Sequence, residues 1–221
     1  MIRVLLADDE VMMRAGARAI LSADPEIEVV AEASDGRQAV ELVHRHRPDV
    51  ALLDVQMPHL NGLDAASAIL RSDTPTAVII LTTFSNDDYI ARALSDGASG
   101  FLLKSGDPRE LIAGVRAVAD GAAYLSPEAA RRVIRGLPSS RTAGQQAARE
   151  QIRKLSGREQ EVLGLLGAGL SNAQIARRLH LVEGTVKTHV SSIFTRLAVG
   201  NRVQAAIIAH EAGLIEEAKG R

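Results

Sequence analysis

The 221-residue chain contains no cysteine and no long hydrophobic run. Without cysteine it can form neither a disulfide nor a thiolate metal site. No stretch approaches the roughly 18–20 consecutive apolar residues that a membrane-spanning helix needs, which excludes a spanning protein. Asp8 and Asp9 follow the start too closely for the apolar stretch of a secretory signal. We therefore expect a globular, cytoplasmic protein without a membrane partner.

Net charge is also low, at −1, but the charges are unevenly distributed along the chain. Residues 1–125 carry 11 Lys and Arg against 19 Asp and Glu, a net charge of −8. Residues 126–221 carry 15 against 8, a net charge of +7. An acidic half followed by a basic half indicates two domains. The basic half favours nucleic-acid binding, although solvated surface charge would give the same count.

Short apolar runs alternate with segments of helical periodicity through the first half. Strands are expected over residues 2–7, 29–33, 49–54, 77–82 and 100–104, and helices over residues 11–23, 36–47, 62–71, 87–96 and 107–120. Five strand–helix repeats predict an α/β fold with a five-stranded, doubly wound parallel sheet of order 2-1-3-4-5. Continuous apolar runs such as Val-Ile-Ile-Leu suit parallel strands that are buried on both faces.

The second half offers no strand candidate. A short helix is expected over residues 126–135, and residues 136–150 lack apolar periodicity, which predicts a mobile linker. Four helices are expected over residues 158–166, 172–179, 184–197 and 202–212. The predicted organisation is a first domain over residues 1–122, a linker with a short helix over 123–151, a smaller all-α domain over 152–216, and a tail over 217–221.

Chemistry-bearing side chains gather where the predicted strands end. Asp8 and Asp9 follow the first strand and Asp54 ends the third, so they should meet at the point where the strand order reverses and ligands bind. Three carboxylates at one place suit Mg²⁺, which prefers hard oxygen ligands. Thr82 closes the fourth strand and Lys104 closes the fifth, where a hydroxyl and an ammonium could bind phosphoryl oxygens. Asp54 is thus a candidate phosphoryl acceptor.

The motifs around these residues resemble the receiver domains of two-component response regulators, over about residues 1–122. They are Leu-Leu-Ala-Asp8-Asp9-Glu, Leu-Leu-Asp54-Val-Gln-Met-Pro58, Leu-Thr82-Thr and Gly-Phe101-Leu-Leu-Lys104. The resemblance implies that a sensor histidine kinase phosphorylates Asp54. It also implies that Asp9 and Asp54 bind Mg²⁺ together with the Gln56 backbone carbonyl, that Asp8 acts through water, and that Thr82, Lys104 and Phe101 are switch residues.

Two positions depart from the receiver pattern. Ser105 follows Lys104 where many receivers have proline, and Asn61-Gly62 replaces a frequent Asp-Gly. The second change is conservative because asparagine also tolerates turn conformations.

The helices expected over residues 172–179 and 184–197 flank a turn of about four residues, which is helix-turn-helix spacing. An apolar stripe runs along the later helix, formed by Val186, Val190, Ile193 and Leu197. The opposite side carries small, polar and cationic residues, which suit insertion into the major groove of DNA. A solvated helix face is the alternative interpretation.

This half resembles the LuxR-type DNA-binding domain over about residues 152–216, through Leu155-Ser-Gly-Arg-Glu159-Gln-Glu-Val-Leu163, Gly169-Leu-Ser-Asn172, Ile175-Ala and Thr185-Val-Lys187-Thr-His189-Val. The resemblance implies that residues 202–212 form a dimer contact. It assigns base-facing positions to Lys187, Thr188 and Ser191 and phosphate contacts to Thr185 and neighbouring basic groups. His189 and Asn172 are expected in the same interface, His189 either packing or contacting phosphate.

Together these features predict a response regulator of the NarL/FixJ type, in which phosphorylation promotes dimerisation and binding to double-stranded promoter DNA, with RNA polymerase as a candidate partner.

Two alternative functions belong to different classes of protein. An aspartate-nucleophile phosphatase would need an acid two residues after Asp54, where the chain has Gln56, so no enzyme is expected beyond self-phosphotransfer and autodephosphorylation. The other alternative is a DNA-binding regulator that uses its receiver without phosphorylation, as an interaction module.

Overall fold

The computed structural model describes residues 1–83, 87–126, 129–130 and 141–215. The chain divides into two compact units, one formed by Met1–Ala119 with Tyr124–Gly136 and the other by Asp120–Ala123 with Leu137–Arg221. Among the described residues, no helix has the length and apolar character needed to cross a membrane.

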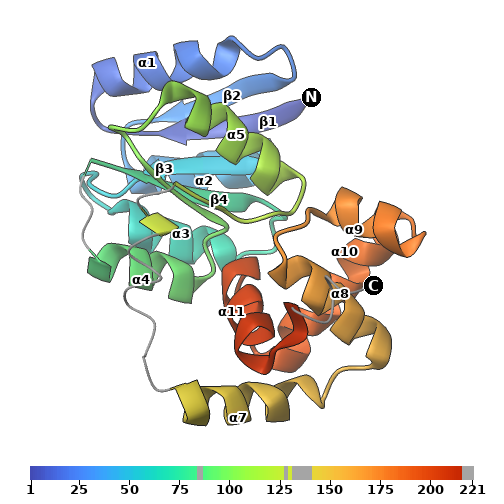
Figure 1. Cartoon of the computed structure of the whole chain (residues 1–221). Coiled ribbons are helices and arrows are strands. Elements are labelled where there is room, and N and C mark those ends of the chain that lie inside the picture. Colours follow the sequence, from blue (N-terminus) through green and yellow to red (C-terminus); the bar gives the residue numbers. More distant parts are fainter. Residues whose placement is uncertain (84–86, 127–128, 131–140, 216–221) are drawn as a thin grey trace. The chain divides into compact units, whose positions relative to one another are not determined.

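The first unit alternates strands and helices around one parallel sheet (Figure 1). Its elements are β1 (Ile2–Ala7), α1 (Val11–Ser22), β2 (Ile27–Ala33), α2 (Gly36–His46), β3 (Val50–Asp54), α3 (Gly62–Leu70), β4 (Ala77–Thr82), α4 (Asp87–Asp96), β5 (Gly100–Leu103), α5 (Pro108–Ala119) and β6 (Tyr124–Leu125). The strand order is β2-β1-β3-β4-β5-β6, which confirms the predicted fold class and order. The short β6 is an additional strand that the sequence analysis missed, since two residues carry no periodicity.

Helices cover both faces of this sheet, because its central strands are mostly apolar and their side chains on both faces are buried. All five residues of β3 are buried. Helices α1 and α5 contact each other on one face, where their apolar side chains join a core with residues of β1, β3, β4 and β5. Contacts link α2 to α3 and α3 to α4 on the other face (Figure 1). Burial on both sides fixes the strand register, and the register brings the carboxyl ends of β1, β3, β4 and β5 to one edge.

The second unit is built from helices. They are α7 (Arg141–Ile152), α8 (Gly157–Gly167), α9 (Asn172–Leu179), α10 (Glu183–Leu197) and α11 (Arg202–Ala212). Their apolar side chains form one core, to which α10 contributes the predicted stripe of Val186, Val190, Ile193 and Leu197.

Helix α7 corrects the predicted linker. The mobile segment was expected over residues 136–150, but residues 141–150 are helical, and Ala148 is buried in the core of the helical unit, where α7 packs on α11. Its sequence, RTAGQQAAREQI, has no regular apolar stripe, yet most of its residues are good helix formers and one packed face suffices. Residues 136–140 lie outside the described residues.

The short helix predicted over residues 126–135 is described only in part. The Ala129 N–H donates to the Ser126 hydroxyl, as expected for a helix that begins after Ser126. Residues 127–128 and 131–135 lie outside the described residues, as does the predicted tail over 217–221.

Candidate phosphoacceptor site and nucleic-acid interface

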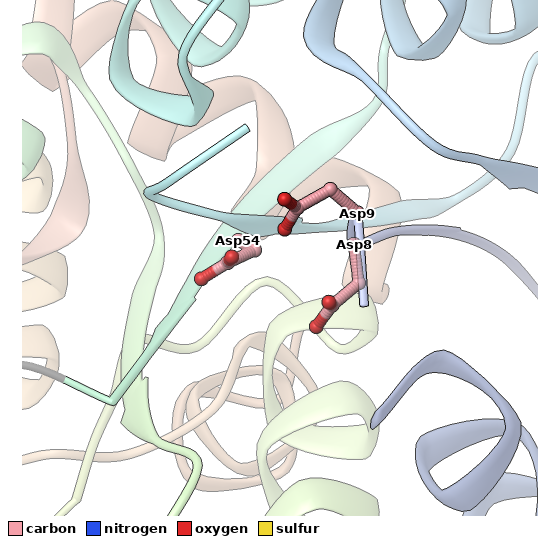
Figure 2. A group of neighbouring side chains, drawn as sticks. All are labelled: Asp8, Asp9 and Asp54. Atoms are coloured by element: carbon pink, nitrogen blue, oxygen red, sulfur yellow. The ribbon is translucent and has the colours of Figure 1, made fainter. Parts of the chain in front are cut away.

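Three carboxylates converge where β1 and β3 end. Asp8 and Asp9 directly follow β1, and Asp54 is the last residue of β3 (Figure 2). One carboxylate oxygen from each residue lies within 4.8 Å of the others. Asp8 and Asp54 are buried, whereas Asp9 is exposed. The site therefore has two inner carboxylates and one that faces solvent.

Lys104 neutralises the inner carboxylates. Its Nζ lies 2.7 Å from Oδ2 of Asp8 and 3.1 Å from Oδ2 of Asp54, and its side chain is only 2% exposed. The ammonium approaches from the end of β5, where the Lys104 N–H donates to the Thr82 carbonyl oxygen at 2.8 Å. The exposed Glu10 carboxylate also lies near this ammonium, with 3.9 Å between Nζ and Oε1. When they are ionised, the three aspartates of the cluster carry more negative charge than the single ammonium neutralises. Hard oxygen donors with that excess charge fit a divalent cation such as Mg²⁺.

The protonation equilibria reflect this burial. Burial raises the pKa of the Asp54 carboxyl, and the charge of Asp8 acts in the same direction, while Lys104 opposes both. Burial disfavours the charged form of Lys104, but the hydrogen bond to Asp8 and the charge of Asp54 outweigh it and raise the Lys104 pKa. Lys104 is therefore a permanent cation beside the candidate acceptor.

Of the remaining predicted residues of this site, two lie in strands of the sheet and Gln56 lies just after β3. Thr82 is the last residue of β4 and is 1% exposed. Phe101 lies in β5 and is completely buried. Gln56 is exposed, two residues after Asp54. The structure thus brings Asp8, Asp54 and Lys104 into direct contact and places Thr82 on the strand end between Asp54 and Lys104.

Two residues near the acceptor were missed by sequence reasoning. The first residue of α3, Gly62, packs against the Asp54 backbone so closely that an added Cβ would lie 1.8 Å from the Asp54 carbonyl oxygen. Arg14 of α1 donates from Nη1 to the Asp8 carbonyl oxygen at 2.5 Å. The Asn61-Gly62 turn was a visible signal, since glycine is typical where two backbones approach closely. The position of Arg14 on a helix gave no such signal.

Helices α9 and α10 form the predicted helix-turn-helix. Ser171 and Gln174 make a reciprocal capping box at the start of α9. The helix ends at His180, whose backbone is in the left-handed conformation. Val182 stands at the start of α10 without a side-chain cap. The turn is therefore short and well defined on the α9 side. On the α10 side, the N-cap side chain accepts no hydrogen bond from the first backbone N–H groups of the helix.

The face of α10 opposite its buried stripe is exposed. Thr188 and Ser191 lie on it, and Lys187 and Thr185 are exposed at its margins. Their contacts with bases and phosphates stay a prediction. The hydroxyls of Thr188 and Ser191 donate back to the carbonyl oxygens of Gly184 and Lys187, at 3.0 Å each. Lys187 pairs with Glu183, with 3.0 Å between Nζ and Oε1. These four side chains thus present methyl groups, hydroxyl oxygens and the Lys187 ammonium.

The other two predicted contacts are placed differently. His189 is half-buried beside the stripe. Asn172 lies at the start of α9, where its Oδ1 accepts a hydrogen bond from Nη1 of Arg202 at 3.1 Å. Asn172 thus ties α9 to α11 within the helical unit, and it does not lie on the α10 face with the other predicted contacts.

Comparison with known families identifies both units. Residues 4–116 match the response regulator receiver domain, and residues 153–209 match the bacterial regulatory proteins of the luxR family. The chain belongs to the response regulators. The transcriptional regulatory protein DegU of Brevibacillus brevis is 37% identical over 216 residues, covering 93% of this chain and 92% of that protein. The nitrate/nitrite response regulator protein NarL of Escherichia coli strain K12 is 35% identical over 208 residues, covering 94% of each.

A solved structure is similar to this response regulator over nearly all of the chain. The crystal structure of the response regulator ChrA in a heme-sensing two-component system has a TM-score of 0.53 and 38% identity, covering 97% of this chain and 98% of that one. A receiver joined to a LuxR-type domain makes this response regulator a two-component transcription factor with a histidine kinase and DNA as partners.

Proposed function

We propose that this response regulator accepts a phosphoryl group on Asp54 and that phosphorylation promotes dimerisation and sequence-specific DNA binding. The observation that carries the proposal is the contact of Asp54 with Lys104 beside two further carboxylates. Asp54 ends a buried strand, and its carboxylate is placed by the contact with Lys104, 3.1 Å from Nζ, which supports its role as the acceptor.

The surrounding residues have separate tasks in this proposal. Asp8, Asp9, Asp54 and the Gln56 carbonyl hold Mg²⁺, which when bound neutralises charge on the phosphoryl oxygens. Lys104 neutralises the transferred group from the β5 side, and Thr82 offers a hydroxyl to it. The buried Phe101 shares β5 with the strand end that bears Lys104, and we propose that it moves with Thr82 when the acceptor is modified.

DNA recognition is assigned to α10. Its exposed face carries Lys187, Thr188 and Ser191, which suit the donors, acceptors and thymine methyl groups of a major groove. Thr185 and His189 lie at the margins of that face and are proposed to contact phosphates. The proposed dimer contact is α11.

The test is oligomeric state measured by light scattering with Mg²⁺, before and after addition of beryllofluoride, a phosphoryl mimic. Native chain and Asp54→Asn are compared. We expect dimerisation only in the native chain with the mimic. An unchanged monomer, or a dimer in every condition, would contradict the switch and favour the second candidate, DNA binding without phosphorylation.

A further inference from the structure

Glu159 is a buried carboxylate that links two helices of the DNA-binding unit. It lies in the first turn of α8 and is 5% exposed. Its Oε2 accepts hydrogen bonds from the backbone N–H and the hydroxyl of Ser156, both at 2.8 Å. Its Oε1 accepts from the Ser192 hydroxyl at 2.6 Å and lies 3.2 Å from Nε of Arg196. One oxygen thus caps α8, and the other holds the side of α10.

The contact on α10 lies next to the exposed face. At 3.6 residues per turn, Ser192 is displaced by only about 40° around the helix from Thr188. Arg196, one turn later, also donates from Nη1 to the Lys154 carbonyl oxygen, just before α8, at 3.1 Å. The polar contacts of Glu159 therefore hold α10 at positions close to its own side chains that are proposed to contact DNA.

Helices α8 and α10 also share apolar contacts. Val162, Leu163 and Leu166 share a core with the buried stripe of α10. Apolar packing is non-directional, so it holds two helices together but restricts rotation of α10 about its own axis less sharply. Hydrogen bonds to a carboxylate are short, directional and strong. They are the contacts best able to set that rotation.

We propose that Glu159 is a positioning residue for DNA recognition, which fixes the rotation of α10 through Ser192 and Arg196. The proposal rests on the proposed function, in which α10 reads the major groove. A rotated α10 would still present positive charge to phosphates, but Thr188 and Ser191 would miss their base edges. Loss of the Glu159 contact should therefore reduce discrimination between DNA sequences and leave non-specific affinity almost unchanged.

Two serine hydroxyls that donate to the Glu159 carboxylate provide a matched pair of variants. Ser192→Ala removes the hydroxyl contact with α10, and Ser156→Ala removes the hydroxyl contact that caps α8. A preferred duplex is first selected from a random pool with the full-length native chain, Mg²⁺ and beryllofluoride. Affinities for that duplex and for a scrambled one are then measured at one salt concentration, and urea unfolding verifies that every variant is folded.

We expect Ser192→Ala to lower the ratio of the two affinities about tenfold, the effect of misplacing one base contact. Ser156→Ala should keep the ratio and lower only the urea midpoint. Ser192→Thr retains the hydroxyl and should retain most of the ratio. The proposal would be overturned if Ser192→Ala kept the native ratio of affinities, or if both alanine variants lowered that ratio equally. Glu159 would then contribute only to stability. If the native chain selects no sequence, DNA reading by α10 itself fails, and the positioning role fails with it.

Discussion

Replacement of Gly62 by alanine should damage the phosphoacceptor site through the backbone. The new Cβ would lie 1.8 Å from the Asp54 carbonyl oxygen and 2.7 Å from its carbonyl carbon, whereas real Cβ contacts are essentially never under 3.0 Å. Helix α3 and the end of β3 must therefore separate by about 1.2 Å. This movement also strains the 3.0 Å hydrogen bond from the Gly62 N–H to the Val55 carbonyl oxygen.

Two measurements follow from that displacement. Overpacking of this size costs about 1–3 kcal/mol of unfolding free energy. A shift of about 1 Å at a reacting atom typically costs on the order of 100-fold in rate, so labelling of Asp54 by a small acyl phosphate with Mg²⁺ should slow by about that factor. Labelling is followed by mass spectrometry of the intact chain.

Gly16→Ala is the matched control. Gly16 lies in α1, and apart from its chain neighbours and the backbone of its own helix no heavy atom lies within 4 Å of an added Cβ. That variant should label at the native rate and gain about 0.5–1 kcal/mol of stability from helix propensity. Native labelling by a folded Gly62→Ala would refute the reasoning, because the close approach to Asp54 would then have no role in placing the carboxylate.

Three further predictions concern the helical unit. Lys187→Ala should flatten the slope of log affinity against log salt by about one if Lys187 contacts phosphate, or change the selected sequence if it reads a base; a variant with neither change removes Lys187 from the interface. Val182→Ser should cap α10 and raise the urea midpoint of this unit by the equivalent of about 0.5–1 kcal/mol, and an unchanged midpoint would argue against an uncapped start. Hydrogen bonds from Ser192 and Ser156 lower the pKa of the Glu159 carboxyl from 4.5 to about 2, so the stability it contributes is complete above pH 4.5 and is lost as the pH falls toward 2. Between pH 5 and pH 3 the native chain should therefore lose on the order of 2 kcal/mol more than Glu159→Gln, and parallel losses in the two proteins would contradict this.

Most of the fold and the charged centre of the site could be predicted from the sequence. Apolar runs that end in Asp54, Thr82 and Lys104 define both the buried strands and the edge where they finish, so one pattern gives the sheet and the site. The parts that escaped prediction depend on tertiary contacts. Helix α7 needs a partner surface for Ala148, and the bridge from Glu159 to Ser192 joins residues 33 apart whose spacing carries no local signal.

The short strand β6 also determines where the receiver can be cut. It pairs with Gly100 and Phe101 of β5, and the Ser126 N–H donates to the Phe101 carbonyl oxygen. A fragment that ends at residue 122, the boundary expected from the sequence, would lack this cover and leave an apolar strand with unpaired backbone groups at the edge of the sheet. Such an edge is a template for pairing with other chains, so a fragment of that length is prone to aggregate. A receiver produced for crystallisation or labelling should extend through Ser126.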